Sequence, residues 1–128
     1  MTPRQDVVLV VDRDLAVREA LKFALEVEGF VVYLCAGGPE LLAHPELRLA
    51  ACLVLDDAMP LMSGVSVLDR LTEGNFRVPV ILMTSHATDS LRRRAVLAGV
   101  RHVLEKPLLN GALVDGIYDI LGHRTALT

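Results

Sequence analysis

Acidic, hydroxyl and basic side chains recur directly after short apolar runs in this sequence. The side chains in question are Asp12, Asp14, Asp56, Thr84 and Lys106. A carboxylate can attack a phosphoryl group to form an acyl phosphate, while a hydroxyl and a lysine can hold the phosphoryl oxygens. Carboxylates are also the groups through which Mg²⁺ binds proteins, usually with several waters retained. These residue types favour phosphoryl chemistry if the fold brings the ends of the apolar runs together.

The elements that must position these side chains follow from an alternation of apolar runs and amphipathic patterns. Strands are predicted at 7–11, 30–34, 51–55, 78–83 and 100–104. Helices are predicted at 15–28, at 91–98 and at 108–121, with Gly29 and Gly99 ending the first two of these. A short helix is also predicted to open at residues 37–39 and run through 42, and another helix is predicted to begin after a cap at Ser63. Such βα units form a doubly wound α/β fold with a parallel sheet, whose ligand site lies beyond the carboxyl ends of the strands. The less uniform run at 30–34 is expected near an edge.

Composition narrows the class of protein. The chain has 128 residues, is 52% hydrophobic and carries a net charge of −3, which predicts a single domain over 1–128. The net negative charge argues against direct nucleic-acid binding. No apolar run approaches the ~20 residues that a membrane span needs. The start lacks a signal-peptide core, and Cys35 and Cys52 are interpreted as buried, reduced thiols. We expect a cytoplasmic protein.

Three motifs carry a resemblance to a known family. They are LVLDDAMPLMSG at 53–64, with Asp56, Met59-Pro60 and Gly64, ILMTSH at 81–86 and VLEKPL at 103–108. Together they resemble the CheY-like receiver domain of two-component response regulators, over about residues 6 to 121. The stretch from Thr84 to Leu108 is similar in length and spacing to the nitrogen-fixation type of receiver.

The resemblance implies a flavodoxin-like sheet of five parallel strands in the order 2-1-3-4-5, with helices on both faces. It implies that Asp56 accepts a phosphoryl group from a histidine kinase or phosphotransfer protein, and that Thr84 and Lys106 bind that group. A cis proline is expected at Pro107. Mg²⁺ is expected among Asp12, Asp14, Asp56 and Ala58; these four positions are the candidate metal site.

The output is expected to pass through a surface rather than a reaction on a substrate. By the resemblance, that surface comprises the helix at 91–98, the strand at 100–104 and the helix at 108–121, and it binds a downstream protein or forms a homodimer. We expect a stand-alone receiver that is not a conventional enzyme, with at most self-phosphotransfer and slow autodephosphorylation.

The sequence departs from the family at two positions. Arg13 stands where a second adjacent acid is usual, and Val103 stands where an aromatic residue is usual, three residues before Lys106. One expectation is that the Arg13 guanidinium pairs with Asp12 or Asp56 and weakens Mg²⁺ binding. The other is that Arg13 turns outward and Asp14 supplies the missing ligand, unless Asp14 instead caps the following helix.

Two alternative hypotheses for the function are also compatible with the sequence. A degenerate receiver would bind proteins without taking phosphate, and the altered acids favour it. The pattern Asp12-Arg13-Asp14 also resembles the haloacid-dehalogenase phosphatases, with Asp12 as nucleophile and Asp14 as general acid. Ala16 stands where that family usually has Thr or Val, and the chain lacks room for its cap.

Overall fold

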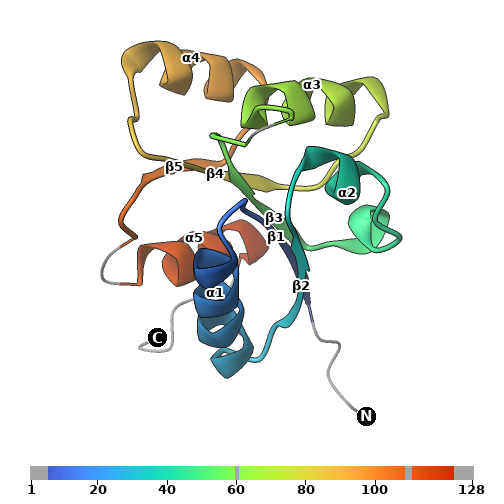
Figure 1. The fold of residues 1–128 in the computed structure, drawn as a ribbon, viewed down its shortest axis with the longest axis vertical. Coiled ribbons are helices and arrows are strands. Elements are labelled where there is room, and N and C mark those ends of the chain that lie inside the picture. Colours follow the sequence, from blue (N-terminus) through green and yellow to red (C-terminus); the bar gives the residue numbers. More distant parts are fainter. Residues whose placement is uncertain (1–5, 60, 109–110, 123–128) are drawn as a thin grey trace.

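The computed structural model describes residues 6–59, 61–108 and 111–122, and it forms one five-stranded parallel sheet flanked by helices (Figure 1). The strand order is β2-β1-β3-β4-β5, as the family resemblance implies. The elements in chain order are β1 (Val7–Val11), α1 (Leu15–Val27), β2 (Val31–Cys35), α2 (Gly38–Leu42), the 3₁₀ helix η1 (Leu47–Leu49), β3 (Cys52–Asp56), α3 (Gly64–Glu73), β4 (Val80–Thr84), α4 (Asp89–Leu97), β5 (His102–Glu105) and α5 (Ala112–Leu121).

Burial separates the central strands from the edge strands. All five residues of β3 and all five of β4 are buried, as expected for parallel strands covered on both faces. The outer strands β2 and β5 are only partly buried, because each pairs on one side alone. The prediction that the second strand lies at an edge is therefore confirmed.

Two hydrophobic cores lie on opposite faces of the sheet because successive strand side chains alternate in direction. Leu9 and Leu55 pack with residues of α2, α3 and α4 on one face. Val8 and Val54 pack with residues of α1 and α5 on the other (Figure 1). Cys35 and Cys52 are free, buried thiols, one in each core, and burial raises the pKa of each to about 12.

Helix ends follow local capping chemistry. Ser63 caps α3 by accepting the backbone N–H of Ser66, as predicted. Gly29 follows α1 with φ 97°, a left-handed conformation that favours glycine. The structure begins α4 at Asp89 rather than at 91, because the Thr88 hydroxyl caps it by accepting the N–H of Leu91.

Several predicted bounds were wrong by one to four residues. β3 and β4 extend through Asp56 and Thr84, which were predicted to follow the strands. The last helix begins at Ala112 instead of at 108. Pro60 of the 53–64 motif and residues 109 and 110 of the predicted last helix lie outside the described residues. The 3₁₀ helix η1 was not predicted. No helix in the described ranges is long and apolar enough to cross a membrane.

Candidate functional site

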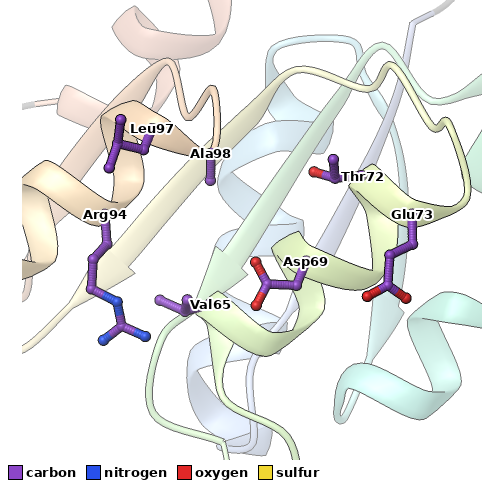
Figure 2. A pocket seen from close by; sticks show the side chains of 7 residues that line it. All are labelled: Val65, Asp69, Thr72, Glu73, Arg94, Leu97 and Ala98. Atoms are coloured by element: carbon purple, nitrogen blue, oxygen red, sulfur yellow. The ribbon is translucent and has the colours of Figure 1, made fainter.

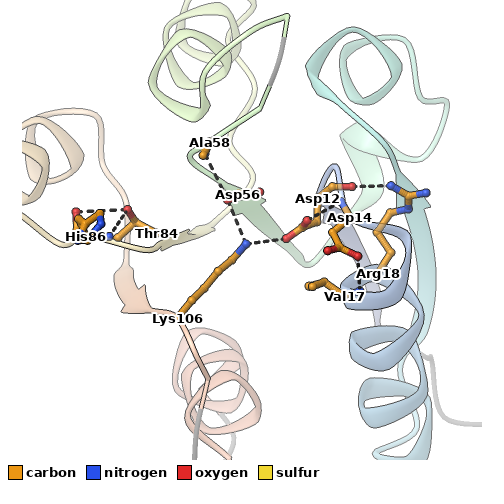
Figure 3. A network of polar contacts seen from close by, with 9 residues as sticks. All are labelled: Asp12, Asp14, Val17, Arg18, Asp56, Ala58, Thr84, His86 and Lys106. Carbon is orange, nitrogen blue, oxygen red and sulfur yellow. Dashed lines mark hydrogen bonds and ion pairs between the residues drawn. The ribbon is translucent and has the colours of Figure 1, made fainter.

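The predicted site residues gather at the carboxyl edge of the sheet (Figure 3). Asp12 directly follows β1, while Asp56 and Thr84 are the last residues of β3 and β4. Within the described ranges these are the three polar or charged side chains that the fold buries, at 0%, 3% and 5% exposure. Burial of polar groups is unfavourable unless they are satisfied, so their clustering at one edge marks the site.

Lys106 links two of these acids. Its Nζ lies 2.9 Å from Oδ2 of Asp12 and 3.3 Å from Oδ1 of Asp56. The chain reaches this position just after β5, where the backbone N–H of Lys106 donates to the Thr84 carbonyl at 2.7 Å and the Lys106–Pro107 bond is cis as expected. A single ammonium group therefore spans from the edge of β1 to the edge of β3 (Figure 3).

The pKa values of Asp56 and Lys106 are both raised above their ordinary values. Burial raises the pKa of Asp56 and the nearby charge of Asp12 raises it further, while Lys106 partly opposes them. Burial lowers the pKa of Lys106, but its hydrogen bond to Asp12 and the charges of both acids outweigh that effect and leave its pKa raised. Lys106 is therefore a permanent ammonium at neutral pH, held where it offsets the repulsion between two carboxylates.

The two oxygens of Asp56 have different surroundings. Oδ1 accepts the backbone N–H of Ala58 at 3.2 Å and contacts Lys106. Among the described residues, Oδ2 accepts no hydrogen bond. The lone pairs of Oδ2 are thus the ones available to a reacting group.

Thr84 lies at the same edge but turns toward its own loop. Its hydroxyl donates to the carbonyl of His86 at 3.3 Å and accepts the His86 backbone N–H at 3.2 Å. The Thr84 hydroxyl forms no hydrogen bond with Asp56 or Lys106 in this arrangement. The structure therefore brings Asp12, Asp56 and Lys106 into contact and holds Thr84 beside them (Figure 3).

Arg13 does not enter the acid cluster. Its side chain is exposed and forms no ion pair with the described residues, so the expected pairing of Arg13 with Asp12 or Asp56 was wrong. Both oxygens of Asp12 are already occupied, Oδ1 by the backbone N–H of Asp14 at 2.9 Å and Oδ2 by Lys106, which accounts for the absence of an Arg13–Asp12 pair. The outward orientation of Arg13 is the arrangement observed.

Asp14 caps α1. Its Oδ1 accepts the backbone N–H groups of Ala16 and Val17 at 2.8 and 3.3 Å, and the residue is exposed. Its carboxylate thus faces the helix terminus. This orientation gives no support to the hypothesis that Asp14 is the general acid of a haloacid-dehalogenase phosphatase with Asp12 as its nucleophile.

A second arginine, which sequence reasoning missed, reaches the site instead. Nη1 of Arg18 donates to the backbone carbonyl of Asp12 at 2.7 Å. Arg18 stands near the N-terminus of α1, where a cation opposes the helix dipole. That unfavourable placement is the signal in the sequence that another group holds this side chain.

The residues present fit Mg²⁺ with a reduced set of ligands. Within the described ranges no cluster of three or more acidic, histidine or cysteine side chains could hold a metal ion, and Asp12 and Asp56 are the two buried carboxylates at this edge. Ala58 has only its backbone carbonyl to offer. Mg²⁺ commonly binds through one or two carboxylates together with water and phosphate oxygens, so this donor set suits it without a third acid.

Comparison with known proteins identifies the family. Residues 8–118 match the response regulator receiver domain. An uncharacterised 14.6 kDa protein in the sodA1 3′ region of Leptolyngbya boryana is 36% identical over 103 residues, 79% of each chain. The transcriptional regulatory protein FixJ of Azorhizobium caulinodans is 33% identical over 114 residues, 89% of this chain and 54% of FixJ.

A solved structure of FixJ-N agrees with the fold. It is 30% identical in sequence, has a TM-score of 0.82 and covers 97% of this chain and 99% of its own. This chain spans about half the length of the FixJ relative. The strand order, the acidic edge with its lysine and the matched sequence together show that the chain belongs to the receiver domain family of two-component response regulators.

Proposed function

We propose that Asp56 is a phosphoacceptor and takes a phosphoryl group from phosphohistidine on a histidine kinase or phosphotransfer protein. The observation that carries this proposal is the contact of one ammonium, Lys106, with both Asp56 and Asp12 at a buried edge. The proposal is also supported by membership in the receiver family.

The transfer is a displacement at phosphorus. An oxygen of Asp56 bonds to phosphorus as the P–N bond to the donor histidine breaks, and the imidazole nitrogen keeps that electron pair and takes up a proton. Oδ2 is the oxygen that no described residue occupies, so we assign the attack to it. Lys106 stabilises the negative charge that develops on the phosphoryl oxygens, because it is already positioned beside Asp56. Thr84 would contribute its hydroxyl after rotating away from His86.

Mg²⁺ would be held by the carboxylates of Asp12 and Asp56 and by the carbonyl of Ala58. When bound, it would neutralise charge on the carboxylates and the phosphoryl group. Its binding should be weak, since Arg13 replaces a carboxylate and Asp14 is engaged at the N-terminus of α1.

The output would be a changed protein-binding surface over α4, β5 and α5. Phosphorylation adds nearly two negative charges at the edge from which the loops to α4 and α5 depart. This charge would favour one of two conformations of the surface, and a downstream protein would bind that conformation. The lack of an aromatic side chain at Val103 means that this change travels through packing on β5.

The proposal is tested by incubating the chain with phosphoramidate over a range of Mg²⁺ concentrations and following its intact mass. One phosphoryl mass should be added at a rate that rises with Mg²⁺. Arg13→Asp should lower the half-saturating Mg²⁺ concentration by ~10-fold, equivalent to ~1.4 kcal/mol. Arg101→Asp is the matched control, because it makes the same charge change next to the start of β5, away from the site. If no adduct forms at saturating Mg²⁺, the degenerate, phosphate-independent receiver is the better account.

A further inference from the structure

An open groove separates α3 from α4 (Figure 2). Its volume is about 520 Å³. The α3 side of the groove is lined by Val65, Asp69, Thr72 and Glu73, and the α4 side is lined by Arg94, Leu97 and the C-cap residue Ala98. Asp12, Asp56, Thr84 and Lys106 are not among the residues that line this groove, so the site described above does not account for it.

The two walls of the groove carry opposite charge. Asp69 and Glu73 lie along the α3 wall, and the guanidinium of Arg94 extends from the α4 wall (Figure 2). Neither Asp69 nor Arg94 forms an ion pair with any described residue, and Glu73 forms only an exposed contact of 3.9 Å with Arg70. The charged groups facing this groove are therefore available to another molecule.

An exposed apolar side chain stands beside these charges. Leu97 is 88% exposed on α4, although it is a large hydrophobic residue. Val65 and Ala98 are only partly buried and extend the apolar surface between the two helices. Burying such a surface is favourable in water, so the groove combines an apolar contact with two charged rims.

We propose that a second copy of this chain docks on this groove, with α4 of each copy against α3 of the other. In a two-fold interface the same patch serves both partners, so a patch that carries an acid and a base on opposite sides is complementary to itself. Arg94 of one copy would face Asp69 of the other, and the reverse pair would form at the same time. Leu97 of each copy would cover the apolar floor of the other copy's groove.

The affinity of the proposed dimer and the orientation of its two copies come from different side chains. Exposed ion pairs contribute little to affinity, so burial of Leu97 supplies most of the attraction. The charges select the orientation, because like charges brought together across an interface are costly. Arg92 provides a control, since it lies about 200° around the α4 helix from Arg94 and does not line this groove.

The test is sedimentation equilibrium of the whole unphosphorylated chain, which does not depend on the proposed phosphorylation. The wild type should show a concentration-dependent dimer. Asp69→Arg and Arg94→Asp should each weaken it by ~10-fold or more, because each change places like charges together twice. Arg92→Asp should leave the dimer unchanged.

Mixing the two single variants separates contacts between copies from effects within one chain. Asp69→Arg and Arg94→Asp are each self-repelling, but together they restore both opposite-charge pairs and should form a heterodimer. Circular dichroism of each variant establishes that it is folded. The inference is overturned if the wild type is monomeric throughout, if the folded single variants do not associate on mixing, or if Arg92→Asp alone abolishes the dimer.

Discussion

At the scale of single residues, the site depends on two buried carboxylates that share one ammonium group. The sequence predicted that Asp12, Asp56 and Lys106 converge on one edge, because the carboxyl ends of parallel strands meet there, and the structure adds that Lys106 contacts both acids. It did not predict the direction of Arg13 or the contact of Arg18 with the Asp12 backbone. Those depend on the turn in which Asp12 accepts the Asp14 N–H, and hydrophobic periodicity carries no information about such a turn.

The raised pKa of Asp56 predicts a pH-dependent gain in stability when its charge is removed. Burial and the charge of Asp12 disfavour the Asp56 carboxylate in the folded state. Asp56→Asn should therefore raise the free energy of unfolding at pH 7 by ~1 kcal/mol, or the melting temperature by ~4 °C. The gain should disappear as pH falls from the raised folded pKa toward the ~3.9 of an unfolded aspartate, since the wild-type carboxyl is then also neutral.

Thermal unfolding at pH 7 and pH 4 measures this difference. Asp57→Asn is the control, because Asp57 neighbours the site but is not among the buried polar residues. A less stable Asp56→Asn at pH 7 would show that the Lys106 contact outweighs burial and the repulsion from Asp12.

Ala58 should make the acyl phosphate long-lived. This exposed residue has no side-chain group with which to orient a water for attack on phosphorylated Asp56. Ala58→Asn should shorten the lifetime by up to ~100-fold, because positioned proton transfer contributes at least that much in enzymes. Decay of the phosphorylated mass after removal of the donor measures the lifetime. Ala58→Val adds bulk without a polar group and should leave it unchanged; equal acceleration by both variants would remove this explanation.

At the scale of elements, capping and turn residues determine where the helices begin and end. Ser63 and Gly29 were read correctly because their roles depend on nearest neighbours in sequence. Gly64 permits a close approach, since a Cβ there would lie 2.9 Å from the Cα of Asp57. The start of α4 was misplaced because Thr88, its cap, precedes a polar first turn without an apolar pattern.

The edge strand β5 should transmit the structural effect of phosphorylation only weakly to α4 and α5. Val103 is half-buried and packs with the core beneath α3 and α4, where it offers neither a ring nor a hydroxyl. We predict that chemical-shift changes on phosphorylation are smaller along α4 and α5 than at Asp12, Asp56 and Lys106. Val103→Tyr should enlarge the changes on α4, whereas large, uniform changes along both helices of the wild type would contradict this account.

At the scale of the whole molecule, two cores on opposite faces of one parallel sheet hold the site edge together. The alternation of β-branched runs with amphipathic helices was sufficient to predict the α/β class and the parallel sheet. The strand order came from the family resemblance, because periodicity does not say which strands are neighbours. The groove between α3 and α4 could not be predicted, since it depends on how two helices lie against each other on the sheet.

The central claim, that Asp56 accepts a phosphoryl group, is tested most directly by the site of the covalent adduct. Wild type, Asp56→Asn and Asp57→Asn should be treated with phosphoramidate and Mg²⁺, and their intact masses compared. We predict one added phosphoryl mass in the wild type and in Asp57→Asn, and none in Asp56→Asn. Persistence of the full adduct in Asp56→Asn would contradict the assignment.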